Sequence, residues 1–126
     1  MKLSSGIDLI EIERIQGALD RHGQRFLARI YTPAEIELSR DSAPELAARF
    51  AAKEAASKAL GTGIGPVSWK EIETINKPSG QPVLRLSGRA KAVARAQGFQ
   101  TWSVSLTHSR GIAAAVVVCL GESPSA

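Results

Sequence analysis

Glu54 and Lys58 stand four residues apart in a stretch made mostly of alanine, RFAAKEAASKALGTGIG, residues 49–65. On a helix, at about 100° per residue, they share one face with Phe50 and small apolar side chains. The pair has an ordinary explanation as a surface ion pair, which stabilises a helix by about 0.2–0.5 kcal/mol. A face of alanines and one phenylalanine is nevertheless expected to be buried, and a buried carboxylate needs a partner. A divalent cation would be one such partner.

Asp8 raises the same question in another part of the chain. It lies in the apolar segment GIDLIEI, whose alternation predicts a strand with Asp8 on the same side as Ile10. Aspartate is disfavoured inside strands, so Asp8 is either bonded to a neighbouring backbone group or serves as a ligand. Magnesium commonly takes one or two carboxylates and fills its other positions with water and phosphate oxygens. Asp8 and Glu54 are therefore candidate magnesium ligands.

The glycine-rich segment GTGIG follows the Glu54 helix directly. Glycines at such a position allow backbone amides to approach a phosphate closely, which makes Gly61 and Gly63 candidate ligand-binding residues. A helix C-cap explains Gly61 equally well, and the segment lacks the lysine and serine or threonine that end a P-loop. Lys53 and Lys58 lie close enough in the sequence to neutralise phosphate charge. Taken together, the carboxylates, glycines and lysines indicate a magnesium–pyrophosphate site.

The elements that must position these residues follow from caps and periodicity. Thr32 and Ser42 each stand three residues before a glutamate with a proline between, the pattern of a helix start with a capping box. Gly23 interrupts the helical spacing that begins near Glu11. The other predicted elements are strands at 3–12, 67–76, 83–88, 101–106 and 112–120, and helices at 44–60 and 88–98. The last two strands are joined by the short segment THSRG and are expected to form a hairpin.

The predicted fold class is α+β, with an antiparallel sheet packed against helices. The 126 residues fit a single domain, placed at 1–121, followed by a frayed tail at 122–126. Hydrophobic residues make up 44% and charged residues 22%, as in soluble globular proteins, whereas aromatics reach only 5%. A core of such small side chains is thin, and a second subunit could supply the missing burial.

Cysteine content and hydropathy exclude several classes of protein. Cys119 is the only cysteine, so neither an internal disulfide nor a thiolate metal cluster can form, and it is expected to be a small buried apolar residue. No apolar run approaches the ~20 residues of a membrane helix, and Asp8 and Glu11 interrupt any signal-like segment. We therefore expect a cytoplasmic protein without membrane contact. The net charge of +4 favours an acidic partner: nucleic acid, a phosphate-rich small molecule or an acidic protein.

Four segments, in this order, resemble a known enzyme family over nearly the whole chain: GIDLIEIERI, RFAAKEAASKALGTGIG, NKPSGQPVLRLSG and SLTHSRGIAAAVVV. The family is the small bacterial type of 4′-phosphopantetheinyl transferase, the holo-acyl-carrier-protein synthases. The resemblance implies transfer of the phosphopantetheine arm of coenzyme A to a serine of apo acyl carrier protein, with release of adenosine 3′,5′-bisphosphate. It also implies a homotrimer with each active site at a subunit boundary.

The resemblance assigns roles to individual residues. It implies that Asp8 and Glu54 bind Mg²⁺ and that Lys58 lies near the phosphates or the attacking hydroxyl. It also implies that His108, in the hairpin, contacts coenzyme A; without the resemblance, His108 would be an exposed turn residue. The proton of the serine hydroxyl would pass to Glu54 or to a metal-bound water, and the sequence leaves that choice open.

Basic residues near the N-terminus suggest where the protein partner binds. Arg14, Arg21 and Arg25 follow Asp8 on one predicted helical stretch and could simply form a solvated face. The resemblance implies that this stretch docks the acidic recognition helix of acyl carrier protein, where positive charge is useful. Arg49, placed away from Glu54 on the helical wheel, serves either a coenzyme phosphate or the structure.

Two alternative functions remain open at the level of sequence. A small basic nucleic-acid-binding module would fit the charge, but the aromatic residues do not gather in one basic segment, as base stacking requires. Such a module would also leave Asp8 and Glu54 unexplained, so we expect no nucleic acid partner. The other alternative is a related transferase that serves the carriers of polyketide or peptide synthases.

Overall fold

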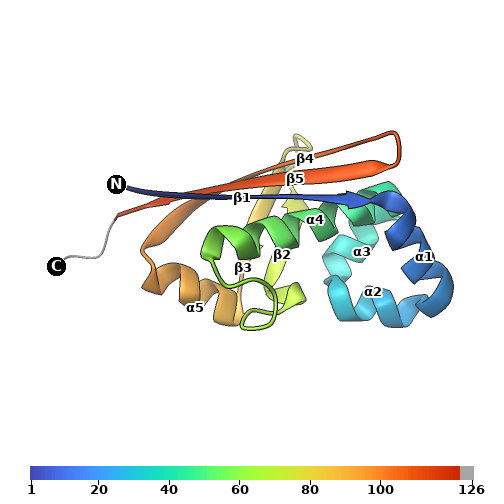
Figure 1. Cartoon of the computed structure of the whole chain (residues 1–126), viewed down its shortest axis with the longest axis horizontal. Helices are drawn as coiled ribbons and strands as arrows, with labels where there is room; N and C mark the ends of the chain where they lie inside the picture. The colour runs from blue at the N-terminus through green and yellow to red at the C-terminus, as the bar shows by residue number, and fades with distance from the viewer. Residues whose placement is uncertain (123–126) are drawn as a thin grey trace.

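The computed structural model describes residues 1–122 of the chain, which form an antiparallel sheet with helices packed on one of its faces (Figure 1). This is the α+β class predicted from the sequence. The elements are β1 (Lys2–Glu11), α1 (Ile12–His22), α2 (Gln24–Ile30), α3 (Pro33–Ser39), α4 (Ala43–Leu60), the 3₁₀ turn η1 (Trp69–Glu71), β2 (Ile72–Asn76), β3 (Pro82–Leu86), α5 (Gly88–Ala96), β4 (Phe99–Ser109) and β5 (Ile112–Gly121). Within the described residues, no helix is long and apolar enough to cross a membrane.

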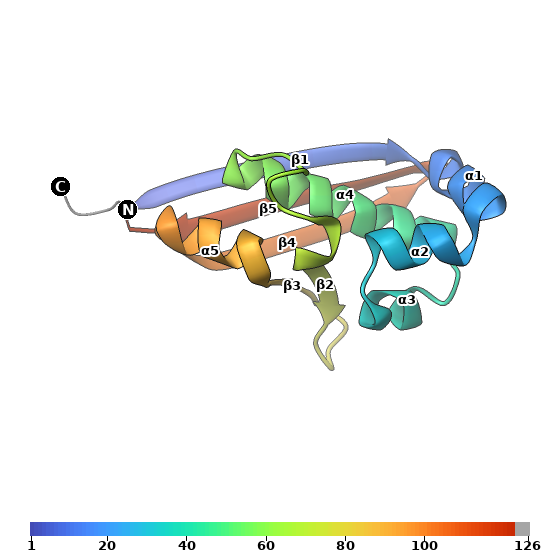
Figure 2. The same cartoon turned by 90° about the horizontal axis from the view of Figure 1, so that it is seen from below.

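The main sheet has the order β1-β5-β4, so that β1 and β4 are its two edges. Asp8 of β1 pairs with Ala115 of β5, and Ala115 pairs in turn with Leu106 of β4. The predicted β4–β5 hairpin is present, but its turn is confined to Arg110 and Gly111, both with positive φ. A second sheet of two strands, β2 and β3, lies beside β4 on the helical side (Figure 2).

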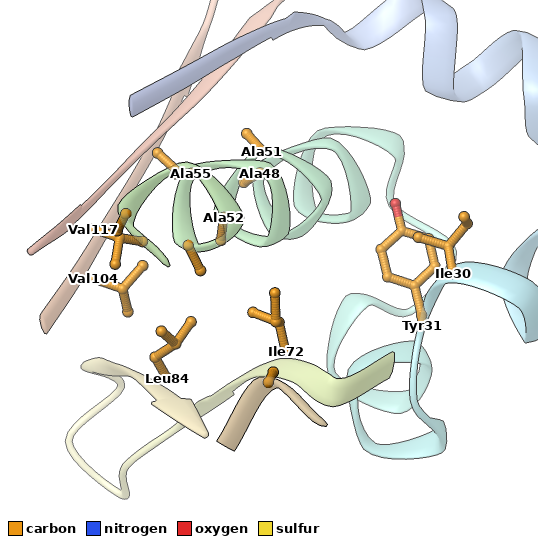
Figure 3. Close-up of a cluster of buried hydrophobic side chains, with 14 of the residues drawn as sticks. Ile30, Tyr31, Ala48, Ala51, Ala52, Ala55, Ile72, Leu84, Val104 and Val117 are labelled. Atoms are coloured by element: carbon orange, nitrogen blue, oxygen red, sulfur yellow. The ribbon is translucent and has the colours of Figure 1, made fainter. Parts of the chain in front are cut away.

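Helix α4 runs through the centre of the core. Its alanines pack against Val104 and Val117 of the main sheet on one side and against Ile72 and Leu84 of the small sheet on the other (Figure 3). Small side chains allow this two-sided packing, because both sheets must approach the helix closely. At Gly6, β1 lies so close to α4 that an added Cβ would overlap the Ala55 carbonyl oxygen. Only glycine allows the two elements to lie this near to each other.

The helix starts agree with the predicted caps. Thr32 forms a complete capping box with Glu35. At α4 the Ser42 hydroxyl accepts a hydrogen bond from the backbone N–H of Glu45, but the Glu45 side chain does not return to Ser42. That side chain is engaged with Arg49 instead.

Two sequence expectations need revision. The strand predicted at 67–76 begins only at Ile72, because Ser68 to Glu71 close a 3₁₀ turn with its own capping box, and the Glu71 carboxylate also accepts from the backbone N–H of Arg89. In the tail predicted at 122–126, Glu122 is bonded to the Gly98 carbonyl through its backbone N–H. Residues 123–126 lie outside the described residues.

Candidate active site

Asp8 and Glu54 come together where β1 crosses α4. Asp8 lies on the inner face of β1, as its alternation with Ile10 predicted, and its side chain is 19% exposed. Glu54 lies half-buried on the side of α4 that faces β1. Gly6 brings the two elements into contact two residues before Asp8. Two carboxylates 46 positions apart in sequence thus share one partly dehydrated site.

Lys58 completes this cluster, but with a different partner from the one expected. Its Nζ lies 3.0 Å from Asp8 Oδ1 and donates a second hydrogen bond of 3.0 Å to the Ile7 carbonyl. The side chain is 52% exposed, so it covers the rim of the site and is not buried within a helix face. Lys58 therefore bridges α4 to β1 and leaves Glu54 without an ion-pair partner among the described residues.

The electrostatics of the pair favour a bound cation. Burial raises the pKa of the Glu54 carboxyl, and the negative charge of Asp8 raises it further, against the opposing effect of Lys58. The described residues contain no group of three or more His, Cys, Asp or Glu side chains that could hold a metal. Two partly exposed carboxylates are nevertheless a donor set that Mg²⁺ uses when phosphate and water complete its shell. The residues present fit that ion.

The glycine-rich loop does not offer the backbone amides expected of it. Gly61 and Gly63 adopt positive φ values of 79° and 66°. Their N–H groups donate to the carbonyls of Lys58 and Ser57, which closes the C-terminus of α4. In this structure these two amides are therefore engaged within the helix end, and phosphate binding by the loop stays a prediction. Both glycines have open space where a Cβ would be, so a ligand can still lie against the loop.

Lys53, the other lysine considered for phosphate binding, is fully buried. Its Nζ donates to Glu35 Oε1 at 2.6 Å and to the Ile72 carbonyl at 2.6 Å. Glu35 also accepts from the backbone N–H of Thr74. Lys53 is thus a structural residue that fixes α4 against α3 and β2, and it thereby sets the position of its neighbour Glu54.

Arg49 and His108 form a separate cluster on the far side of α4. The Arg49 guanidinium is 1% exposed, and its Nη1 lies 2.9 Å from Glu45 Oε2. The His108 Nε2 lies 3.4 Å from Glu45 Oε1. The sequence identified Glu45 only as a helix-capping residue, because nothing in its local spacing indicates a histidine 63 positions away.

Asp8 and His108 lie on opposite edges of the main sheet. Asp8 is on the edge strand β1 and His108 is on the edge strand β4, with the central strand β5 between them. The structure brings Asp8, Glu54 and Lys58 together, and it does not bring His108 to them.

The arginines of the N-terminal region line hollows on the surface. Arg14 and Arg21 of α1 line a hollow of about 410 Å³ whose apolar wall includes Phe26 and Phe50. Arg25 lines a smaller neighbouring hollow of about 220 Å³. Phe50 lies one helical turn before Glu54, so the first hollow opens beside the carboxylate cluster.

The outer face of the main sheet is exposed and apolar. The largest such side chains are Leu3 (68% exposed), Ile7 (67%) and Leu9 (65%) on β1, and Val116, Val118 and Leu120 (each 38%) on β5. A contiguous apolar surface of this kind is typical of a protein interface. Ile7 and Leu9 flank Asp8 in sequence, so this surface lies directly behind the carboxylate cluster.

Comparisons with known proteins agree with this architecture. The family model described as "ACPS: 4′-phosphopantetheinyl transferase superfamily" matches residues 4–117. The holo-[acyl-carrier-protein] synthase of Herpetosiphon aurantiacus is 52% identical over 126 residues, covering 94% of this chain and 99% of the relative. That of Dehalococcoides mccartyi strain 195 is 53% identical over 116 residues, covering 92% and 97%.

Solved structures give the same result. The Helicobacter pylori holo-[acyl-carrier-protein] synthase in complex with coenzyme A superposes with a TM-score of 0.85 at 38% identity, covering 92% of this chain and 99% of that one. The Bacillus anthracis holo-(acyl-carrier-protein) synthase in complex with CoA (3′,5′-ADP) has a TM-score of 0.77 at 37% identity, covering 94% and 96%.

The chain therefore belongs to the 4′-phosphopantetheinyl transferase superfamily, as a member of its holo-[acyl-carrier-protein] synthase family. Enzymes of this family transfer the 4′-phosphopantetheine group from coenzyme A to acyl carrier protein, a step of fatty acid biosynthesis. The resemblance, fold and transferase activity predicted from the sequence motifs are confirmed. The alternative of a nucleic-acid-binding module is not supported.

Proposed function

We propose that this transferase binds the pyrophosphate of coenzyme A through Mg²⁺ held by Asp8 and Glu54, and delivers the phosphopantetheine arm to an acidic carrier protein docked on α1. The observation that carries the proposal is the convergence of two carboxylates in one site, with the pKa of Glu54 raised by burial and by Asp8. A structural role would have paired Glu54 with a cation of the chain. We place the enzyme in the cytoplasm.

The reaction joins the serine oxygen of the carrier to the β-phosphorus of coenzyme A and breaks the bond from that phosphorus to the bridging oxygen. Adenosine 3′,5′-bisphosphate leaves. A magnesium ion at Asp8 and Glu54 would supply charge neutralisation and polarisation of the phosphoryl group. Lys58 places a positive charge at the rim of this site, where phosphate oxygens gain negative charge. The serine proton would pass to Glu54 or to a metal-bound water.

The exposed sheet face supports assembly with further copies of the chain. Covering Ile7, Leu9 and their neighbours on β5 would remove apolar surface from water, and burial of such surface is the main driving force of association. Assembly would also explain why Asp8 and His108 lie on opposite edges of the sheet: one coenzyme A could contact Asp8 of one chain and His108 of the next. We propose a homotrimer, the assembly that the family resemblance implies.

Carrier docking rests on charge and on the hollow beside α1. Reversing both Arg14 and Arg21 to glutamate should raise the KM for the carrier protein by about tenfold or more, since like charges across an interface slow association and weaken it. The KM for coenzyme A should stay within about twofold, because the arginines lie outside the carboxylate cluster. Steady-state kinetics with each substrate varied in turn measures both values.

The control for this docking prediction is Arg95→Glu, which reverses an exposed charge on α5 and leaves α1 intact. This variant should change neither the KM for the carrier protein nor the KM for coenzyme A appreciably. Equal losses for carrier and coenzyme A in the Arg14/Arg21 variant would show that α1 is not the docking face.

The metal proposal is tested by thermal unfolding with and without Mg²⁺. A ligand that binds only the folded state raises the midpoint, so millimolar Mg²⁺ should raise the wild-type Tm by a few degrees and leave Glu54→Gln unchanged. Because the pKa of Glu54 is raised, this carboxyl takes up a proton at a higher pH than an ordinary glutamate, and the Mg²⁺ effect should fade as pH falls through that raised value. If Mg²⁺ does not change the Tm of the wild-type protein at neutral pH, the metal proposal is contradicted.

A further inference from the structure

The carboxylate of Glu45 occupies a position between two groups suited to bind an anion. Its Oε2 accepts from Arg49 Nη1 at 2.9 Å, and its Oε1 lies 3.4 Å from His108 Nε2. The side chain is 44% exposed, whereas its backbone is held in the first turn of α4 by the Ser42 cap. The carboxylate can therefore swing into solvent without unfolding the helix.

Arg49 would keep its place if Glu45 moved away. Its Nε donates to the Thr74 carbonyl and its Nη2 to Asn76 Oδ1, both on β2. The acceptors of Nη1, in contrast, both belong to Glu45: the carboxylate at 2.9 Å and the backbone carbonyl at 3.5 Å. Displacement of the Glu45 side chain would thus leave one fixed guanidinium N–H, together with His108, facing open solvent.

We propose that Glu45 is an internal competitor for the phosphomonoester of coenzyme A at the position formed by Arg49 and His108. This inference rests on the proposed function and adds a determinant of its affinity. Coenzyme A carries two anionic groups, and the carboxylate cluster with its metal takes the pyrophosphate. The 3′-phosphomonoester needs separate positive groups, and the Arg49–His108 cluster on the other edge of the sheet offers them in an adjoining copy of the chain.

Competition and orientation predict opposite results when the charge of Glu45 is removed. If Glu45 competes with phosphate, Glu45→Gln removes a negative charge from the binding position, and coenzyme A should bind about fivefold to tenfold tighter, with the gain shrinking at high salt. If Glu45 only orients His108 and Arg49, the same variant should bind coenzyme A more weakly. Dephospho-coenzyme A, which lacks the phosphomonoester, should bind both proteins equally.

The experiment measures the Kd of coenzyme A and of dephospho-coenzyme A by calorimetry for the full-length wild type, Glu45→Gln and Glu45→Ala, in Mg²⁺. Asp41→Asn is the matched control, since it removes an exposed charge just before α4 that has no ion-pair partner among the described residues, at a positive φ that asparagine tolerates. Thermal unfolding of each variant verifies folding. The expected result is a gain for coenzyme A alone in both Glu45 variants and none in Asp41→Asn.

Three results would overturn the inference. These are weaker or unchanged binding of coenzyme A by folded Glu45 variants, an equal gain for dephospho-coenzyme A, or an equal gain in Asp41→Asn. A wild-type protein that binds neither compound would instead contradict the proposed function itself, so the two failures are distinguishable.

Discussion

Glu54→Gln should lower the rate of phosphopantetheine transfer by about 10³-fold or more, in a protein that still folds. The substitution keeps the size of the side chain but removes one of the two anionic oxygens available to Mg²⁺, and metal-assisted stabilisation of a phosphoryl transition state is worth several kcal/mol. Asp8→Asn should cause a loss of the same order. Both losses are measured as turnover at saturating coenzyme A, carrier protein and Mg²⁺.

The two variants should differ in stability without metal. Burial and Asp8 raise the pKa of Glu54 above its unfolded value, so folding stability falls as pH rises from the unfolded pKa through the folded one. At neutral pH, Glu54→Gln removes the free-energy cost of keeping a charged carboxylate in this site. The variant should therefore be as stable as the wild type or slightly more stable. Asp8→Asn loses its ion pair with the half-exposed Lys58 and should be less stable by under about 1 kcal/mol.

Chemical denaturation in the presence of a chelator measures these stabilities. Normal turnover in either folded variant would contradict the assignment of the ligands. A marked destabilisation of Glu54→Gln would instead mean that Glu54 has a structural partner. A low rate of transfer would then be explained by loss of folded protein and not by loss of a metal ligand.

Val118→Lys should dissociate the proposed homotrimer and abolish most of the activity with it. Val118 lies on the central strand β5 with its side chain on the outer, apolar face of the sheet. In a lone chain, a lysine at this position should lower the folding stability by less than about 1 kcal/mol, because the position is half-exposed in the strand. Within an interface, the same charge would be buried without a partner, which is far more costly. If each active site lies at a subunit boundary, a dissociated chain loses the His108 that the neighbouring chain would place beside its Asp8 and Glu54.

The matched control for this prediction is Leu38→Lys. Leu38 is 40% exposed, against 38% for Val118, but it lies on α3, away from the sheet. Light scattering after size exclusion, together with rates measured over a range of protein concentrations, tests both variants. We expect a small, inactive species for Val118→Lys and a wild-type assembly for Leu38→Lys. A dissociated Val118→Lys chain with full activity would show that one chain holds a complete active site.

The sequence anticipated those parts of the site that depend on local pattern. The alternation around Asp8 and the alanine-rich face around Glu54 both placed a carboxylate against apolar surface, and in the fold the two meet. The capping signals at Thr32 and Ser42 likewise set the starts of α3 and α4 correctly. Each of these inferences concerns residues within one turn or one strand, where spacing determines direction.

The parts that sequence reasoning missed depend on contacts between distant elements. A helical wheel shows which face Lys58 occupies, but not that Asp8, 50 positions away, would replace Glu54 as its partner. Lys53 looks like a surface cation in the sequence, yet a buried glutamate from α3 holds it in the core. The sequence does not show that the backbone N–H groups of Gly61 and Gly63 donate to the carbonyls of Lys58 and Ser57, because these bonds form only when the helix end folds. The loop geometry and the Glu45 contacts follow from tertiary packing alone.

Magnesium-dependent transfer by this protein is tested most directly by the intact mass of purified apo acyl carrier protein after incubation with the protein, coenzyme A and Mg²⁺. We expect a gain of one phosphopantetheine arm, which disappears when a chelator is added and when Glu54→Gln replaces the wild type. A gain that persists in chelator would contradict the magnesium site at Asp8 and Glu54. The absence of any gain, with a folded enzyme and several apo carriers, would contradict the function itself.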